Sequence, residues 1–102
     1  MPQSLNIIFH GINRSVALEQ SVEEKLEALR RFDPELGPCK VTVSQETSKA
    51  HGEFTVLVNL KACSGKDLIV KRAHMDALAA VHDAFDVLRR NVKEEHDKAH
   101  NR

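Results

Sequence analysis

Apolar residues recur at helical spacing near the end of the chain. The steps between them are three, four, three and four residues, and the stripe comprises Leu78, Val81, Phe85, Leu88 and Val92. Residues with this spacing lie on one face of an α-helix. No Gly or Pro interrupts the segment from Met75 to His100. The pattern therefore predicts a long amphipathic helix whose apolar face lies on another part of the protein.

An earlier stripe has the same period and comprises Leu18, Val22, Leu26 and Leu29. Ser15 precedes it and is a good N-cap residue, and acidic residues come before Arg30 and Arg31, in the order that the helix dipole favours. The segment 33–38 holds two prolines and a glycine, which cannot continue a helix. We therefore expect a first helix from Ser15 to about Phe32, followed by a turn.

Four shorter segments have the composition or the alternation of β-strands. In the first three segments apolar residues recur at every second position, as in a strand with one buried face, and the fourth is a short apolar run. The predicted strands are Leu5–His10, Cys39–Ser44, Phe54–Lys61 and Leu68–Lys71. The string Ser64-Gly65-Lys66-Asp67 is typical of a hairpin turn between the last two strands.

The predicted order of elements is β-α-β-β-β-α. A helix between the first two strands makes that pair parallel through a right-handed crossover, and the other strands form a meander. Each helix has one apolar stripe and the sheet has one apolar face, so both helices pack on one face of a four-stranded mixed sheet. We therefore expect an α+β fold in a single domain, residues 1–102, whose end frays over residues 98–102 because no apolar partner holds it.

Composition and charge limit the possible functions. The 102 residues carry 15 basic and 15 acidic side chains, so no overall field attracts nucleic acid or an anionic membrane. No apolar run is long enough to cross a bilayer, and the chain opens without a leader and has only two cysteines, which favours the reducing cytoplasm. No catalytic triad motif or Gly-rich phosphate loop is present. We therefore expect no catalytic residues, no cofactor and no small-molecule substrate.

A polar flank borders the second helical stripe on one side. Its members follow at steps of four and three residues: His82, Asp86, Arg89, Lys93, His96 and His100. Arg89 and Lys93 can lie along a phosphate backbone, and the histidines add charge at acid pH. Further basic candidates are Lys25, Lys71-Arg72 and Arg90. The alternatives are a solvated flank that covers the core and, for Lys71-Arg72, an edge strand protected by charge.

Histidine and cysteine offer two further kinds of chemistry. His96 and His100, with Asp97 nearby, can bind a metal ion only if a third ligand converges from elsewhere, and the sequence indicates none, so no metal site is predicted. Cys39 and Cys63 fall at strand ends that can approach each other, but two small apolar fillers are favoured over a redox pair. A metal-dependent or hydrolytic enzyme built on the six histidines is the alternative from a different functional class.

Several short strings of residues, spread over nearly the whole chain, are informative when their order is considered together. They are the opening strand with Gly11, Ser15–Leu18, Lys25-Leu26 with Leu29, Phe32-Asp33, Met75-Asp76, Leu78–Val81, Phe85-Asp86 and Arg90. In that order and at that length, they resemble the ribosome hibernation-promoting factor family, also called sigma-54 modulation proteins, in its short form. The string Asp83-Ala84-Phe85-Asp86 resembles a string that is found in one branch of this family.

The resemblance implies a fold like that of the double-stranded-RNA-binding domain and a function without catalysis. Such a factor occupies the messenger and transfer RNA channel of the small ribosomal subunit during slow growth or stress, and so inhibits translation. The implied partner is the small subunit and its RNA, and the implied form off the ribosome is a cytoplasmic monomer. Because the chain lacks the C-terminal extension of members that dimerise ribosomes, a pairing role is not expected.

The resemblance also implies which residues contact RNA. In the family, basic side chains along the two helices make the contacts, and Lys25 and Arg90 match them, with Lys98 near the end. The predicted RNA-binding residues are Lys25, Lys71, Arg72, Arg89, Arg90 and Lys93. Many members carry Lys or Arg where this chain has Glu19, Ala28, Val87, Glu94 and His96. Since fewer phosphate contacts weaken binding, the alternative is a protein interaction module without tight ribosome binding.

Overall fold

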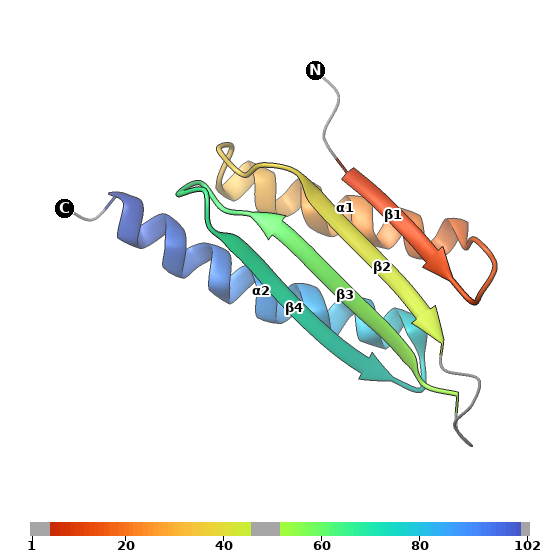
Figure 1. Ribbon diagram of the computed structural model, residues 1–102. Coiled ribbons are helices and arrows are strands. Elements are labelled where there is room, and N and C mark those ends of the chain that lie inside the picture. The colour runs from red at the N-terminus through yellow and green to blue at the C-terminus, as the bar shows by residue number, and fades with distance from the viewer. Residues whose placement is uncertain (1–4, 46–51, 101–102) are drawn as a thin grey trace.

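The structure, a computed structural model, describes residues 5–45 and 52–100 (Figure 1). Its elements are β1 (Leu5–His10), α1 (Val16–Phe32), β2 (Cys39–Gln45), β3 (Phe54–Lys61), β4 (Asp67–His74) and α2 (Ala77–His100). The predicted order β-α-β-β-β-α is confirmed. The main difference among the strands is that β4 extends beyond the predicted Leu68–Lys71 at both ends.

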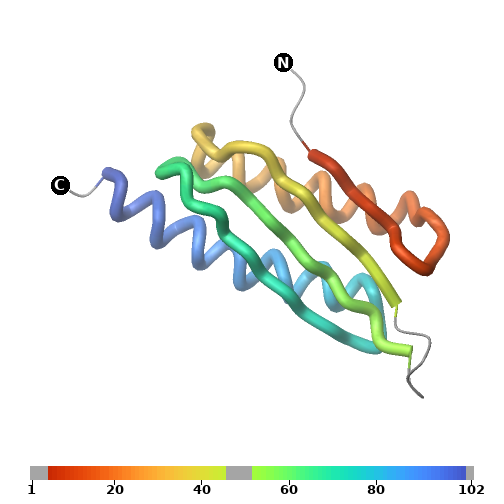
Figure 2. The backbone as a smooth tube through the Cα atoms, viewed as in Figure 1, coloured from red at the N-terminus to blue at the C-terminus, as the bar shows by residue number. Residues whose placement is uncertain are grey.

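The strands form a four-stranded mixed sheet in the order β1-β2-β3-β4. β1 and β2 are parallel, whereas Val58 of β3 lies opposite Val41 of β2 and Val70 of β4 in antiparallel pairs. The parallel pair follows from α1, because a chain that returns to the same end of the sheet needs a crossover of about a dozen residues or more. Both helices lie side by side on one face of the sheet (Figures 1 and 2). The predicted α+β architecture is therefore confirmed.

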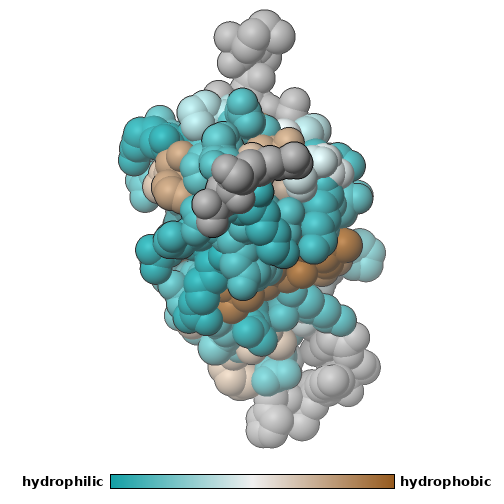
Figure 3. Space-filling model, turned by 90° about the vertical axis from the view of Figure 1, so that its left-hand side faces the viewer, coloured by the Kyte–Doolittle hydropathy of each residue, from teal (hydrophilic) through white to brown (hydrophobic). Residues whose placement is uncertain are grey.

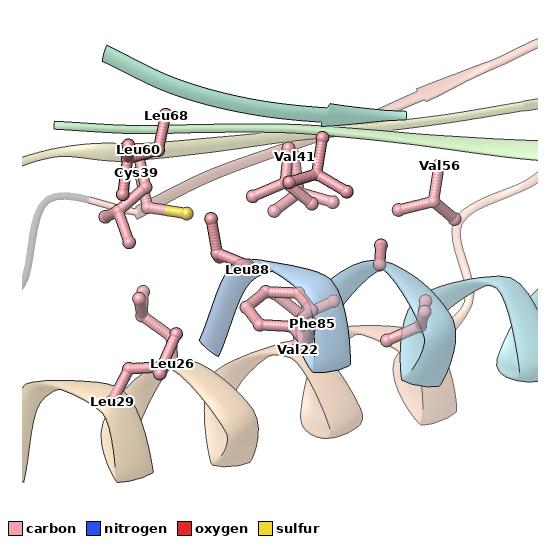
Figure 4. Packing of buried hydrophobic residues seen from close by; sticks show 14 of the residues in the cluster. Val22, Leu26, Leu29, Cys39, Val41, Val56, Leu60, Leu68, Phe85 and Leu88 are labelled. Atoms are coloured by element: carbon pink, nitrogen blue, oxygen red, sulfur yellow. The ribbon is translucent and has the colours of Figure 1, made fainter. Parts of the chain in front are cut away.

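The hydrophobic core lies between the sheet and the two helices. Side chains from the strands, such as Val41 and Leu60, point toward Val22 of α1 and Leu88 of α2 (Figure 4). These four side chains have no measurable exposure. The edge strand β1 packs against this core with partly buried side chains, namely Leu5, Ile7 and Phe9. The period-two pattern of the sequence therefore correctly identified the buried faces of β1, β2 and β3.

Helix α1 has the predicted ends and the predicted buried face. The Ser15 hydroxyl accepts a hydrogen bond from the Leu18 amide at 3.3 Å, which satisfies one of the free N–H groups of the first turn. At the other end, the Asp33 amide donates to the Leu29 carbonyl at 2.8 Å. All four residues of the predicted stripe are buried: Leu18, Val22, Leu26 and Leu29.

Helix α2 buries four of the five residues of its predicted stripe, namely Val81, Phe85, Leu88 and Val92. The helix begins at Ala77. The carboxylate of the preceding residue, Asp76, accepts a hydrogen bond from the Leu78 amide at 3.3 Å. Leu78, predicted in the core, is 39% exposed, whereas Ala80 and Ala84 are fully buried. The prediction for Leu78 was wrong because large apolar residues were weighted above alanines. Small side chains let a helix approach its neighbours closely, so the alanine side of α2 packs inward.

The structure continues α2 through Lys98 to His100. The fraying expected for residues 98–102 stays a prediction. His100 Nδ1 lies 2.9 Å from the His96 carbonyl, and Lys98 lies 3.6 Å from the Glu95 carboxylate. These local polar contacts hold the last turn without an apolar partner. Residues 101–102 lie outside the described part of the chain.

The predicted hairpin turn between β3 and β4 is present. Gly65 has a φ of 90°, a conformation that residues with a Cβ rarely adopt, and the Ala62 amide donates to the Lys66 carbonyl at 2.8 Å. Ser64 joins the turn to α2, since its hydroxyl donates to the buried Glu95 carboxylate at 3.1 Å.

In residues 5–45 and 52–100, neither helix has the length and apolarity needed to span a membrane.

Candidate nucleic-acid interface

A groove of about 1000 Å³ lies between α1 and α2. Its floor is apolar and comes from both helices: Ala28, Leu29, Phe32, Ala79 and Phe85. Leu29 and Phe85 belong to the core, whereas Ala28 and Phe32 are exposed, so the groove opens to solvent directly above the core. Because the sheet covers the other side of the helices, the groove lies on the outer surface of the helical layer (Figure 1).

Three of the predicted RNA-binding side chains line this groove. Lys25 comes from α1, and Arg89 and Lys93 come from successive turns of α2. His82 and Asp86, also members of the predicted flank, line the same side. The spacing of three and four residues places these side chains above one another along α2. Cationic groups therefore border the groove from both helices, in an arrangement that can follow a phosphate backbone.

Carboxylates of α2 pair with its groove cations. The Asp86 carboxylate lies 3.6 Å from Arg89 and 3.0 Å from Arg90, and the Asp97 carboxylate lies 3.0 Å from Lys93. All these side chains are more than half exposed, so each pair contributes only about 0–1 kcal/mol and a phosphate group can replace the carboxylate. Within residues 5–45 and 52–100, Lys25 has no ion-pair partner.

Lys71 and Arg72, predicted as one basic cluster, point to opposite faces of β4. Lys71 follows the buried Val70 and lies on the open face of the sheet. Arg72 lies on the helix-covered face, 3.6 Å from the Asp83 carboxylate of α2, which also contacts His74 Nε2 at 2.8 Å. The hydrogen bond with His74 is the main cause of a lowered pKa for Asp83, and the charge of Arg72 adds to it.

The six predicted residues therefore do not form one uninterrupted basic face. Lys25, Arg89 and Lys93 gather at the groove. Arg72 and Arg90 pair with carboxylates along α2. Lys71 lies across the sheet from all of them, on its open face. Neighbouring residues of a strand point to opposite faces of the sheet, so the sequence already places Lys71 and Arg72 on different faces. The partner of Arg72, in contrast, depends on how α2 packs beside β4.

His96 was predicted on the same flank but does not line the groove. Its side chain is 26% exposed, and its Nδ1 lies 3.3 Å from the buried carboxylate of Asp33. The rings of Phe32 and His100 lie 4.8 Å and 4.3 Å from the His96 ring, measured between centroids. The part of the flank that borders the groove therefore ends at Lys93. Sequence reasoning missed the contact with Asp33, because the two residues are distant in the chain and share no motif.

Both cysteines are free. Cys39 is buried in the core, where desolvation raises the pKa of its thiol to about 11. Its packing matches the favoured prediction of an apolar filler. Cys63 is half-buried at the start of the β3–β4 turn. Burial is the main cause of a raised pKa for the Cys63 thiol. A hydrogen bond with Asp33 and the charges of Asp33 and Glu35 raise this pKa further.

A mixed sheet covered on one face by two helices, with a cation-bordered groove between them, defines a class of small α+β binding domains. The sequence matches the model of one protein family, described as Sigma 54 modulation protein / S30EA ribosomal protein, over residues 5–100. Because this match spans nearly the whole chain, the chain belongs to that family. The family resemblance inferred from the sequence is therefore confirmed, and it indicates a ribosome-associated factor.

Solved structures support the same fold. The N-terminal domain of Protein Y from Thermus thermophilus is 25% identical, with a TM-score of 0.75, and the alignment covers 92% of this chain and 98% of that one. A ribosomal subunit interface protein from Coxiella burnetii is 17% identical, with a TM-score of 0.76, covering 88% of this chain and 93% of that one. Its identity is low enough that it supports the fold alone. Among curated proteins, none matches the sequence.

Proposed function

We propose that this protein binds the RNA of the small ribosomal subunit through the groove between α1 and α2. By occupying the subunit in the cytoplasm of resting or stressed cells, it inhibits translation without catalysis, and it is a monomer off the ribosome. The observation that carries the proposal is the position of Lys25 across the groove from Arg89 and Lys93, in a chain of a ribosome-associated family.

The physical basis is exchange of ion-pair partners. Arg89 and Lys93 hold exposed carboxylates that contribute little to stability, so an RNA phosphate can displace them and gain a charge-assisted contact. Lys25 needs no such displacement. Arg72 of β4 and Arg90 of α2 each pair with a carboxylate of α2 and can extend the contact along the RNA. A neutral chain can in this way present a local cationic surface, although its net charge attracts no RNA from a distance.

Salt dependence supplies a quantitative test with purified small subunits. Three phosphate contacts correspond to a slope of about −2.1 to −2.7 in log affinity against log salt, so raising the salt concentration fourfold weakens binding roughly 20–40-fold. The double variant Arg89→Glu/Lys93→Glu removes two of these contacts. Its slope is expected to fall in magnitude by about 1.4–1.8, with a much lower affinity at low salt.

Lys40→Glu/Lys71→Glu is the matched control, because it makes the same charge change on the open face of the sheet. Both side chains are exposed there. The groove proposal expects this variant to keep the wild-type slope. The single variant Lys71→Glu tests the prediction that Lys71 contacts RNA, since a slope reduced by one contact would support a place for Lys71 in the interface. If the groove variant binds as tightly as the wild type at both salt concentrations, the groove is not the RNA site.

Inhibition of translation needs its own measurement. Wild-type protein added to a cell-free translation system is expected to reduce initiation on vacant ribosomes, and the groove variant is expected not to. Binding by the wild type with undiminished translation would separate ribosome association from inhibition and overturn the second half of the proposal.

A protein interaction module is the second candidate, and the acidic residues of α2 favour it. Asp83, Asp86 and Asp97 lie among the cations, and the floor of the groove is apolar enough to receive a hydrophobic side chain of a partner. For this candidate, association with ribosomes is weak and insensitive to salt. The salt titration therefore distinguishes the two candidates directly.

A further inference from the structure

The chain has four phenylalanines and neither tryptophan nor tyrosine. All four lie in the part of the chain that the structure describes. Phe85 is buried in the core, and Phe9 and Phe54 are half-buried in β1 and β3. Phe32, the last residue of α1, is 46% exposed. Phe32 is therefore the one phenylalanine whose ring offers a large surface to a ligand.

Phe32 lies at one end of the groove between α1 and α2. It lines the groove from α1, as Lys93 does from α2. The two helices end on the same side of the molecule (Figures 1 and 2). The Phe32 ring lies 4.8 Å from the ring of His96, which follows Lys93 by about one turn of α2. An aromatic ring and a cation from different helices thus share this end of the groove.

Contacts from α2 fix the surroundings of the Phe32 ring. The His96 ring is tilted by 53° against it. His96 is itself held by the buried Asp33 carboxylate, 3.3 Å from its Nδ1, and by the ring of His100, with 4.3 Å between centroids. A side chain that is already ordered loses little conformational freedom when a ligand binds. Phe32 is therefore a preorganised aromatic surface.

Hydrophobic surface is scarce at this end of the molecule, where it is limited to a narrow band and small patches among hydrophilic surface (Figure 3). A single exposed hydrophobic side chain is common in proteins, so the alternative is that Phe32 only covers the Asp33–His96 contact. A cover alone does not explain why the exposed ring lines a groove that Lys25 and Lys93 border. An aromatic ring beside cations suits a nucleotide, which has a flat base and an anionic phosphate.

We propose that an unpaired RNA base stacks on the ring of Phe32 while neighbouring phosphates bind Lys25 and Lys93. This inference rests on the proposed function of the groove and specifies the form of RNA that the groove takes. Stacking on an aromatic side chain needs a base that has left its own stack, as in single strands, loops and bulges. The groove therefore prefers single-stranded or looped RNA over a regular duplex. It does not select one base, because every base has a flat π-face.

Tryptophan fluorescence tests stacking directly. Because the chain has no tryptophan, Phe32→Trp introduces a single fluorophore and keeps an aromatic ring at this position. At low salt, a short single-stranded RNA is expected to quench its emission through base stacking. Inorganic polyphosphate, which supplies phosphate without bases, is expected to leave the emission nearly unchanged. Ile69→Trp is the matched control and is expected to show no quenching, because Ile69 is 62% exposed on the open face of the sheet.

Binding to purified small subunits measures the contribution of the ring. Phe32→Leu keeps an apolar cover over Asp33 and His96 but removes the π-face. Loss of one stacked base corresponds to roughly 5–150-fold weaker binding, which is the effect that we expect for Phe32→Leu. The affinity is expected to keep the wild-type salt slope, because no charge changes. Phe32→Tyr keeps the ring and is expected to bind like the wild type, and circular dichroism checks that each variant is folded.

Two results would overturn the stacking proposal. One is emission from Phe32→Trp that bound RNA leaves unchanged, or that polyphosphate quenches as strongly as RNA does. The other is a folded Phe32→Leu variant that binds small subunits as tightly as the wild type, which would make Phe32 a cover only. Neither result decides whether the groove binds RNA, since the salt slope of Arg89→Glu/Lys93→Glu tests that proposal separately.

Discussion

Unequal burial along α2 predicts very different costs for two chemically identical substitutions. Leu88 is fully buried between the helices and the sheet, whereas Leu78 is 39% exposed. Leu88→Ala removes buried methyl groups and leaves a cavity, which costs about 2–5 kcal/mol. Leu78→Ala removes only partly buried surface, and water can fill the space, so we expect a loss of about 1 kcal/mol. The hydrophobic stripe of the sequence alone predicts equal losses.

Urea unfolding followed by circular dichroism measures this difference. With a slope of about 1–3 kcal/mol per molar urea, Leu88→Ala is expected to lower the midpoint by on the order of 1–2 M, and Leu78→Ala by much less. The slope itself should stay unchanged in both variants, which confirms that the comparison reports on the folded state. Losses for Leu78→Ala and Leu88→Ala that agree within about 0.5 kcal/mol would refute the difference in burial between the two leucines.

Three further predictions concern the ends of the elements and the titrating groups. Ser15→Ala is expected to cost about 1 kcal/mol in thermal unfolding, whereas Ser15→Gly costs only a few tenths; equal losses would argue against the N-cap. Because the folded pKa of Asp83 lies below its usual 3.8, the stability from its contacts is present above that value and is lost as the pH falls through the lowered pKa. Asp83→Asn should therefore make the acid-side fall in melting temperature shallower, and an unchanged fall would contradict the assignment. Finally, Cys63 is expected to react with a thiol reagent in the folded protein, while Cys39 reacts only on unfolding, and a fast-reacting thiol left in Cys63→Ser would disprove this order.

A neutral net charge does not exclude a local binding surface in this protein. Arg89, Arg90 and Lys93 are each paired with a carboxylate of α2, one helical turn or less away. Pairs at this spacing stabilise a helix weakly and stay exposed to solvent. The same cations can therefore stabilise the free helix and bind phosphate. The proposed interface thus depends on exchange of partners, and raising the salt concentration should weaken RNA binding more than it weakens the fold.

Part of the candidate site could be predicted from the sequence. The helical period placed Arg89 and Lys93 on one side of α2, and the structure brings that side to the groove opposite Lys25. The Asp33–His96 contact could not be predicted in this way, because no period or motif links the end of α1 to the end of α2. His96 was assigned to the flank since helical spacing gives the direction of a side chain but not its partner.

The sequence by itself determined the type and order of the elements, the parallel first pair, and the buried faces of both helices and of β1, β2 and β3. These features follow from local periodicity and from the short connections between elements, which act within a few residues. Only the tertiary structure decided that Leu78 stays partly exposed while Ala80 and Ala84 are buried, that Arg72 pairs with Asp83, and that Asp33 faces His96. Such features depend on close packing between segments that are distant in the sequence, which local periodicity does not describe.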